Sequence, residues 1–270
     1  MHLSEINIYP VKSLAGISLK ESPIDSYGLR YDRKWMLIGE DNTFISQRTF
    51  PKMALLKTAI DLNHLKIFSD QLPVGELKID LIPQAYEEQI KVNIWEDQVM
   101  SWRLSAAFDH WFSQALDIDC RLVYMPSVTK RKVNSKFAHA NEIVGFADDF
   151  PFLLISEASL QDLNSRLPKP VPMKRFRANL IIANKEPYAE DLWHIIKIGD
   201  NRFEVTKPCA RCSVTTVDTE TALKGKEPLS TLATYRSIGN KVMFGQNLLC
   251  QQGESLKVGD QLEVISLKQT

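Results

Sequence analysis

The sequence has no long apolar run, no excess of charge of one sign and few cysteines. None of its 270 residues lies in an uninterrupted apolar stretch of the roughly 18 residues that a bilayer-spanning helix needs. The first residues lack the charged and then apolar order of a signal peptide. Lysine plus arginine equals aspartate plus glutamate, 33 of each, so no global field attracts nucleic acid or an anionic membrane. We therefore expect a cytoplasmic protein that binds neither.

The cysteines and histidines are too sparse for two common kinds of site. Four cysteines without regular spacing do not form a disulfide framework, which agrees with a reducing compartment. The five histidines lie far apart without metal-ligand spacing, and we do not expect them to be catalytic; they are His2, His64, His110, His139 and His194. A local site must therefore come from other residues.

Short predicted strands dominate the chain. Apolar and polar side chains alternate between turn clusters such as Gly39-Glu40-Asp41-Asn42, which is typical of a barrel or sandwich. In the first half we predict strands at 6–9, 17–20, 34–38, 43–46, 54–62, 64–68, 76–82, 89–95 and 98–102. Further strands are predicted at 120–125, 152–155, 179–183, 195–198, 202–206 and 242–249, with a final hairpin turning at Gly259-Asp260.

A few helices interrupt the strands. Ser105 and Ser156 each precede apolar residues at helical spacing and are predicted N-caps, and a short helix is predicted at 229–236. With 44% hydrophobic and 24% charged residues, the chain is long enough for two ordinary globular domains. We predict a mainly β (α+β) fold with a β-barrel-like unit at 1–120 and a second unit at 121–270.

The stretch 207–218 holds the most unusual chemistry of the sequence. Cys209 and Cys212 stand three positions apart with Arg211 between them and Lys207 just before. Neighbouring positive charge stabilises a thiolate, so a cysteine here is a candidate metal ligand or nucleophile. The β-branched residues that follow, 213–217, predict a buried strand.

Three other interpretations of the two cysteines are open. They could be a half-buried pair without function, a thioredoxin-like redox dithiol or part of a zinc site. A closed zinc site needs four ligands, but Cys120 and Cys250 stand isolated. A thioredoxin-like pair would begin a helix, whereas the following residues favour extended chain. The zinc and thioredoxin-like interpretations therefore fit poorly.

Six motifs in order resemble the MOSC domain family, in the branch of the amidoxime-reducing components. The resemblance covers nearly the whole chain. The motifs are Tyr9-Pro10-Val11-Lys12-Ser13, the segment 28–35, the segment 151–159, Arg175-Phe176-Arg177-Ala178-Asn179, the Cys209 to Asp218 stretch and Phe244-Gly245-Gln246-Asn247. It implies a MOSC N-terminal β-barrel followed by a MOSC β-barrel with a few short helices, distantly related to pyridoxal phosphate-family sulfurases.

The resemblance implies a molybdenum cofactor, Mo-molybdopterin, with one protein thiolate on the metal. The family motif places that ligand on Cys212 rather than Cys209, and a thiolate suits a metal already bound to sulfur. Cys209 would then be a buried structural thiol or a group that tunes the sulfur environment.

The resemblance also assigns cofactor-binding residues, because the phosphate of the pterin needs cationic and hydroxyl donors. They are Lys12, Ser13, Arg33, Ser156, Arg177, Asn179 and Arg211. Structural alternatives exist: Arg33 could pair with Asp32, Ser156 could be only an N-cap, and Arg177 and Asn179 could form a polar pair at a barrel edge. Asp218 is expected to form a turn, and Gln246 either reaches the metal or forms an ordinary polar contact.

The implied function is the reduction of small N-hydroxylated compounds, namely hydroxylamines, amidoximes and N-hydroxylated bases. The chain carries no C-x4-C-x2-C motif for an iron–sulfur cluster, so electrons are expected from a separate flavin or iron–sulfur reductase. One alternative is a sulfur carrier with a persulfide on Cys212. Another is a module that stores or passes on the cofactor without turnover.

Overall fold

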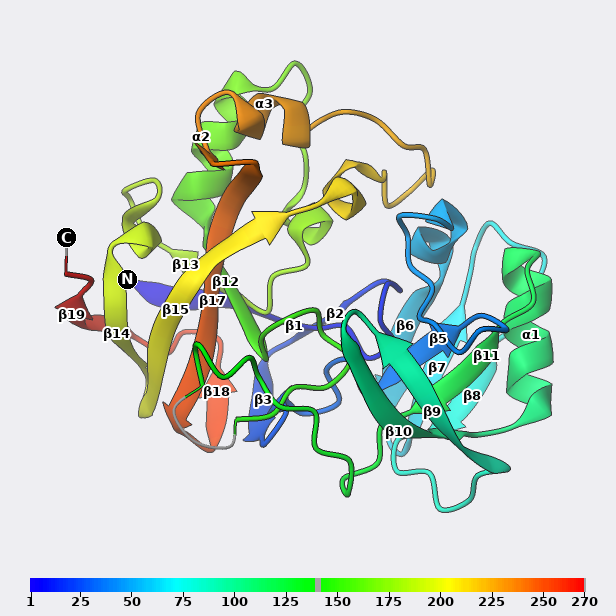
Figure 1. Cartoon of the computed structure of the whole chain (residues 1–270). Helices are drawn as coiled ribbons and strands as arrows, with labels where there is room; N and C mark the ends of the chain where they lie inside the picture. Colours follow the sequence, from blue (N-terminus) through cyan, green and yellow to red (C-terminus); the bar gives the residue numbers. More distant parts are fainter. Residues whose placement is uncertain (139–141, 270) are drawn as a thin grey trace.

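The computed structural model describes residues 1–138 and 142–269 and shows two groups of β-strands side by side (Figure 1). His139 lies outside the described residues. The mainly β prediction is confirmed. No helix of the described residues is long and apolar enough to cross a bilayer.

The larger group is a nine-stranded sheet within the described residues. Its main path runs in the order β19-β14-β15-β17-β12-β13-β1-β2, and β16 pairs with β17. The bounds are β19 Leu262–Leu267, β14 Trp193–Ile198, β15 Asn201–Arg211, β17 Lys241–Gln252, β12 Phe152–Ser156, β13 Leu180–Ala183, β1 His2–Ile8, β2 Ile17–Leu19 and β16 Ser237–Ile238.

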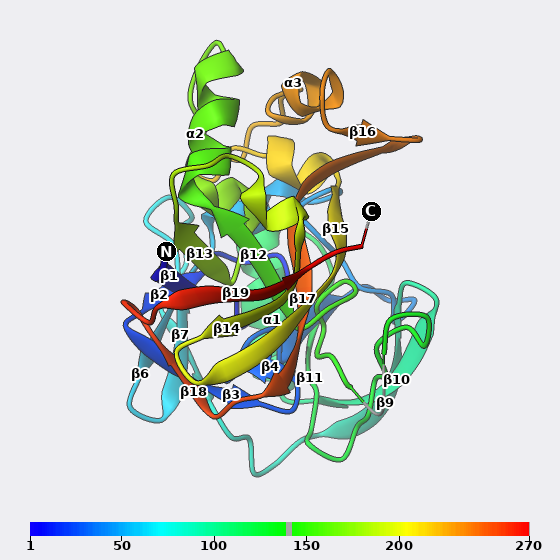
Figure 2. The same ribbon diagram turned by 90° about the vertical axis from the view of Figure 1, so that its left-hand side faces the viewer.

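Barrel closure of this sheet is partial. Figure 2 views the sheet from its β19 and β14 side. A single bridge between His2 and Gln261 brings β1 to the start of β19, and Leu262 donates its N–H to the Met1 carbonyl. The sheet therefore curls until β1 and β19 meet at one point, but no paired ladder joins these two strands.

Two smaller sheets form most of the second group. One has the order β5-β11-β10-β9 and the other β6-β7-β8. Their bounds are β5 Trp35–Ile38, β11 Arg121–Tyr124, β10 Asp97–Arg103, β9 Glu88–Ile94, β6 Lys57–Asp61, β7 His64–Phe68 and β8 Leu77–Asp80. A fourth sheet joins β18 Ser255–Lys257, β3 Glu21–Asp25 and β4 Gly28–Leu29.

The final hairpin predicted at Gly259-Asp260 is wrong. The turn is present, but β18 pairs with β3 and β19 pairs with β14. The turn therefore carries the chain from one sheet to another. The predicted strand 43–46 is reduced to single bridges, from Thr43 to Asn93 and from Phe44 to Ile38.

Helices begin where the N-caps predict. Ser105 Oγ accepts the N–H of Ala107 at the start of α1 Ala106–Leu116, and Ser156 Oγ accepts the N–H of Ser159 at the start of α2 Glu157–Arg166. The other helices are α3 Leu229–Ala233 and the 3-10 helices η1 Pro51–Leu55, η2 Met173–Phe176, η3 Ala189–Asp191 and η4 Ser213–Thr216. In both views α2 and α3 lie beyond the same end of the large sheet (Figures 1 and 2).

Strands cross between the two groups. β1 and β2, from the start of the chain, belong to the large sheet, whereas β11 pairs with β5 and β10 in the smaller group. The apolar residues of β12, all buried, lie in the core of the large sheet, and β5 is equally buried in the smaller group. The proposed boundary near residue 120 stays a prediction.

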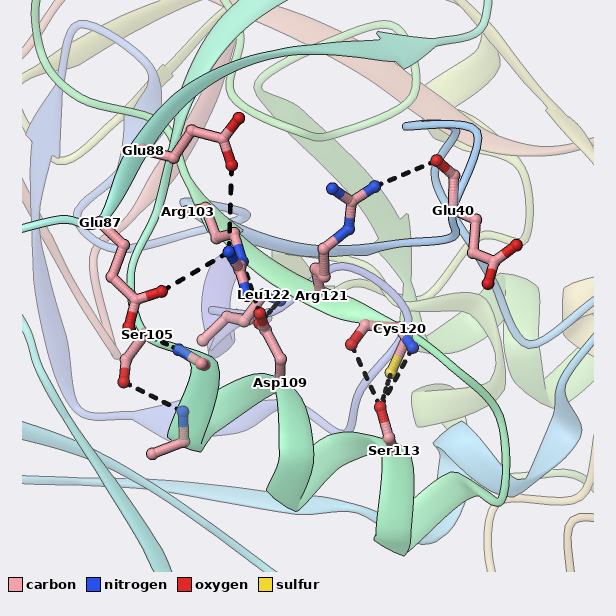
Figure 3. A network of polar contacts seen from close by, with 12 residues as sticks. Glu40, Glu87, Glu88, Arg103, Ser105, Asp109, Ser113, Cys120, Arg121 and Leu122 are labelled. Carbon is pink, nitrogen blue, oxygen red and sulfur yellow. Dashed lines mark hydrogen bonds and ion pairs between the residues drawn. The ribbon is translucent and has the colours of Figure 1, made fainter.

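A buried aspartate fixes α1 to its sheet (Figure 3). Asp109 Oδ1 accepts the N–H of Leu122 at 2.7 Å, and Oδ2 accepts Arg103 Nε at 2.7 Å. At the other end of the helix, Ser113 Oγ accepts the N–H of Cys120 at 3.1 Å. These contacts join the helix to β10 and β11.

We expect Asp109→Ala to lower the free energy of unfolding by about 2–3 kcal/mol, because the buried Leu122 N–H and the Arg103 guanidinium lose their acceptor. Urea unfolding of the variant measures the loss. Asp119→Ala, at an exposed position nearby, serves as the control and should change stability by less than about 0.5 kcal/mol. Equal losses in the two variants would contradict the assigned role.

Candidate functional site

A cavity of about 250 Å³ opens between the two strand groups. Its walls come from turns near β1 and β5, from the segment 147–150, and from β15, η4 and β17. Seven cationic side chains and two carboxylates are among its lining residues, although the whole chain has a formal charge of zero. The cations are Lys12, Arg33, Arg48, Arg177, Lys207, Arg211 and Lys241, and the carboxylates are Asp148 and Asp149. The charge at this place favours an anionic ligand.

Cys212 lies at the end of β15, where the chain changes direction. The expected strand at 213–217 is wrong: β15 ends at Arg211, and Cys212 is the N-cap of η4. The Thr215 hydroxyl donates to the Cys212 carbonyl at 3.0 Å, and the Thr216 hydroxyl donates to the Ser213 carbonyl at 2.8 Å. Such local bonds compete with strand pairing. They fold the β-branched run into a turn directly after the cysteine.

Arg211 contacts the other cysteine. Its Nη1 donates to Cys209 Sγ at 3.0 Å and its Nη2 donates to the Phe176 carbonyl at 2.6 Å. Its Nε is buried and has no hydrogen-bond partner among the described residues. The Arg211 guanidinium therefore contacts Cys209, and one Arg211 donor stays available.

Tyr9 contacts two cavity arginines. The Arg33 and Arg177 guanidinium carbons lie 4.4 and 4.3 Å from the centre of its ring. Asp32 Oδ2 accepts Arg33 Nη1 at 2.6 Å, and Asp32 Oδ1 accepts the Tyr9 N–H at 2.7 Å. Burial and the Arg33 charge lower the pKa of Arg177 to about 10, so the Arg177 guanidinium is still cationic near neutral pH. An aromatic face holds such cations in place.

The backbone is strained at three of the predicted site residues. Ser13, Arg33 and Arg177 have φ values of 68°, 47° and 56°, in the left-handed region that residues other than glycine rarely adopt. Hydrogen bonds fix this geometry: Arg33 Nη2 donates to the Arg177 carbonyl at 3.1 Å, and Arg177 Nη1 donates to the Leu14 carbonyl at 2.5 Å. Strain of this kind is concentrated at functional sites.

Two lysines of the cavity are paired with the carboxylates of segment 147–150. Lys12 Nζ lies 2.5 Å from Asp148 Oδ1 and donates to the Phe146 carbonyl at 2.8 Å. Burial lowers the pKa of Lys12, and the Asp148 charge opposes that shift. Lys207 Nζ lies 3.0 Å from Asp149 Oδ2. An ammonium has three donors, so Lys12 can still donate one hydrogen bond to a ligand.

The cavity brings most of the predicted site residues together. Those lining it are Lys12, Ser13, Arg33, Arg177, Asn179, Arg211 and Cys212. Ser156 is not among them: it is fully buried, and its hydroxyl caps α2. Asn179 also has a structural task, because its amide accepts the Leu153 N–H and donates to the Asn7 carbonyl.

Two further expectations concern polar residues near the cysteines. Asp218 forms a turn as expected, since its Oδ1 accepts the N–H groups of Glu220 and Thr221 at 2.9 and 3.0 Å. Gln246 is fully buried and donates to Asp191 at 2.6 Å, so it makes an ordinary polar contact, while its neighbour Asn247 lines the cavity.

Sequence reasoning missed Arg48 and Lys241 as cavity residues. Arg48 lies with its guanidinium carbon 4.4 Å from the Trp95 ring centre, and Lys241 begins β17. Neither belongs to a motif, and only the fold brings them near Cys212. Among the described residues, no group of three or more histidine, cysteine, aspartate or glutamate side chains could hold a metal ion.

The four cysteines should differ in their reaction with iodoacetamide. Burial raises the pKa of Cys120 and of Cys250 to about 11, so at pH 8 only about one thiol in a thousand is the reactive thiolate. We expect Cys209 and Cys212 to be labelled first, and labelling of Cys250 to rise about tenfold per pH unit between pH 8 and 10.

Mass spectrometry of tryptic peptides measures these rates separately. Cleavage after Arg211 puts Cys209 and Cys212 in different peptides, and Cys120 and Cys250 lie in two others. Labelling of Cys250 that is already fast at pH 8 and does not rise with pH would contradict the expectation.

Models of known protein families match both halves of the chain. The MOSC N-terminal beta barrel domain model matches residues 1–119, and the MOSC domain model matches residues 141–263. A molybdenum cofactor sulfurase of Arabidopsis thaliana is 35% identical over 268 residues, which are 90% of this chain but 32% of the relative. This chain thus spans about a third of that sulfurase.

Other relatives are similar over most of their length. Mitochondrial amidoxime-reducing component 1 of Mus musculus is 31% identical over 276 residues, covering 96% of this chain and 80% of the relative. Among solved structures, YiiM from Geobacillus stearothermophilus is similar over 44% of this chain and 55% of its own, with a TM-score of 0.32 and 16% identity.

Proposed function

Because the chain belongs to the MOSC domain family, we propose that it is a molybdenum cofactor-dependent oxidoreductase that reduces N-hydroxylated compounds. Its substrates would be hydroxylamines, amidoximes or N-hydroxylated bases. The observation that carries the proposal is a half-buried thiol, Cys212, on the wall of a cavity whose charged side chains are mostly cationic. The relatives named amidoxime-reducing components support the reaction class.

The residues around the cavity fit such a cofactor. A thiolate is the ligand that a sulfur-bound metal prefers, and Cys212 supplies one. The buried Arg211 Nε has no partner among the described residues, so it offers a donor to a bound acceptor. Arg33 and Arg177 present guanidiniums, which match the oxygen atoms of a phosphate.

Each group of the chain has a separate task in this proposal. Arg33, Arg177 and Lys12 hold the phosphate end of the cofactor, and contact with the Tyr9 ring keeps the two guanidiniums in place. Cys212 fixes the other end. The cofactor, when bound, supplies the two-electron chemistry that removes oxygen from nitrogen. Ser156 is left out of the proposed site because it lies outside the cavity.

The partners in this proposal are a small N-hydroxylated substrate and a separate electron-donor reductase, a flavin or iron–sulfur protein. The cytoplasmic location predicted from the sequence stays a prediction.

The test is to produce the protein in a host that makes the cofactor and to measure molybdenum per chain. Turnover of benzamidoxime to benzamidine is then followed with dithionite-reduced methyl viologen as the electron source. We expect close to one molybdenum per chain and formation of benzamidine. A well-folded protein without molybdenum would overturn the proposal.

A second candidate is a sulfur carrier. The thiols of Cys209 and Cys212 line the same cavity. The Arg211 guanidinium contacts Cys209 at 3.0 Å, and a cation beside the two thiols suits an anionic sulfur species. The relatives named molybdenum cofactor sulfurases support this class. Mass spectrometry of the protein, purified without reductant, tests it: one extra sulfur atom on the Cys212 peptide, in protein free of molybdenum, would favour the carrier.

A further inference from the structure

The 3-10 helix η2 contacts the cysteine segment on both sides of Cys212. Before the cysteine, Arg211 Nη2 donates to the Phe176 carbonyl at 2.6 Å. After the cysteine, Arg175 Nη1 donates to the Thr215 carbonyl at 3.4 Å. The residue that follows η2, Arg177, lines the cavity itself. One short helix therefore connects the thiol with an anion-binding wall.

Arg175 sits at the centre of these contacts without lining the cavity. Its side chain is 10% exposed, and its Nη2 lies 3.1 Å from Asp218 Oδ2. Asp218 Oδ1 accepts two backbone N–H groups of the turn after η4. The ion pair therefore holds that turn against η2.

The contact with Thr215 leads directly to Cys212. The Thr215 N–H and hydroxyl donate to the Cys212 carbonyl at 3.2 and 3.0 Å. Thr215 is buried, so its carbonyl has little access to water if Arg175 withdraws. A change at Arg175 is thus transmitted through one residue to the backbone of the cysteine.

We propose that Arg175 is a positioning residue for Cys212: by holding Thr215 and Asp218 against η2, it fixes the turn from which the thiol faces the cavity. That Arg175 positions a metal ligand rests on the proposed function, whereas its effect on the reactivity of the Cys212 thiol does not. Residues that hold a metal ligand in its orientation, without binding the metal themselves, typically lower metal affinity about 10- to 100-fold when they are removed.

The first experiment measures the iodoacetamide reaction of Cys212 in metal-free protein from pH 6 to 10. Arg175→Met keeps the apolar stem but removes both contacts. We expect the limiting rate at high pH to rise about tenfold, because losing a hydrogen bond to a charged group frees the turn to open. Arg166→Met is the matched control, since Arg166 pairs with Asp162 on α2 at 2.8 Å, and its Cys212 rate should equal that of the wild type.

Arg175→Lys separates positioning from general stability. A lysine can still pair with Asp218 but has no second nitrogen for the Thr215 carbonyl. We expect its melting temperature to stay near that of the wild type while the Cys212 rate stays raised. Slow labelling of Cys120, which is buried beside α1, reports in every variant that the remaining fold is intact.

The second experiment measures molybdenum retention after dialysis of protein loaded in the cell. Retention should fall about 10- to 100-fold in Arg175→Met and remain unchanged in Arg166→Met. An unchanged Cys212 rate in Arg175→Met would overturn the positioning role. Absence of molybdenum from the wild type would overturn the proposed function instead, and the labelling result would stand without it.

Discussion

Cys212→Ala is expected to reduce molybdenum content and amidoxime turnover by more than about 100-fold. Removing a residue that orients a metal ligand already lowers metal affinity or activity about 10- to 100-fold. Loss of the ligand itself should lower both by more. The cavity and its cationic residues remain, which leaves the phosphate contacts intact. Metal analysis and turnover of the same preparation measure both effects.

Cys209→Ala is the matched control for this prediction. Cys209 lines the same cavity and stands three residues away, but we assign no metal bond to it. We expect it to keep molybdenum, with a moderate loss of turnover because Arg211 Nη1 loses its sulfur contact. The assignment would be reversed if Cys209→Ala lost the metal and Cys212→Ala retained it.

Gly245→Ala should destabilise the large sheet by about 3 kcal/mol. Gly245 has a φ of 81°, and a Cβ atom there would lie 2.6 Å from Ile155 Cγ1 and 2.8 Å from the Leu154 carbonyl oxygen. The cost combines left-handed backbone with overpacking. Guanidinium chloride unfolding measures the loss.

The same substitution should disturb the cavity. Pro208 pairs with Gln246, and Ala210 pairs with Met243, so β17 has one extra residue opposite Cys209, a bulge that includes Gly245. We expect faster iodoacetamide labelling of Cys209 in Gly245→Ala.

Gly239→Ala isolates the backbone part of the Gly245 effect. Gly239 also has a positive φ, 58°, but a Cβ atom there meets nothing within 4 Å. Its loss should be about 1 kcal/mol. Equal losses at the two glycines would show that packing against Leu154 and Ile155 contributes nothing.

Local patterns predicted most of the elements but not all of their partners. The caps at Ser105 and Ser156 and the buried strand at 152–155 depend on neighbouring residues, and the structure confirms them. Pairing of β18 with β3 depends on residues far apart in the chain, which no local pattern reveals. The run 213–217 was misassigned because threonine favours strands on average, whereas here its hydroxyls bond to the preceding carbonyls.

The candidate site was predictable where it belongs to motifs. Lys12, Arg33, Arg177 and Cys212 come from four distant motifs, and the fold brings them to one cavity. Ser156 belongs to a motif as well, but capping a helix occupies its hydroxyl. The side chains that come from unremarkable loops, such as Arg48, could not be predicted, since their place depends on the packing of the two strand groups.

Pairing between β1 and β13 constrains how the protein can be synthesised. His2 pairs with Ala183, so β1 leaves the ribosome long before β13 exists, and only β2 can pair with it early. Leu3, Ile6 and Ile8 are fully buried in the finished sheet, yet in the nascent chain the edge of β1 that will meet β13 has no partner, and such an apolar edge is prone to aggregation. The large sheet therefore cannot be completed until the second half of the chain has been made, and protection by a chaperone during translation should raise the yield of folded protein.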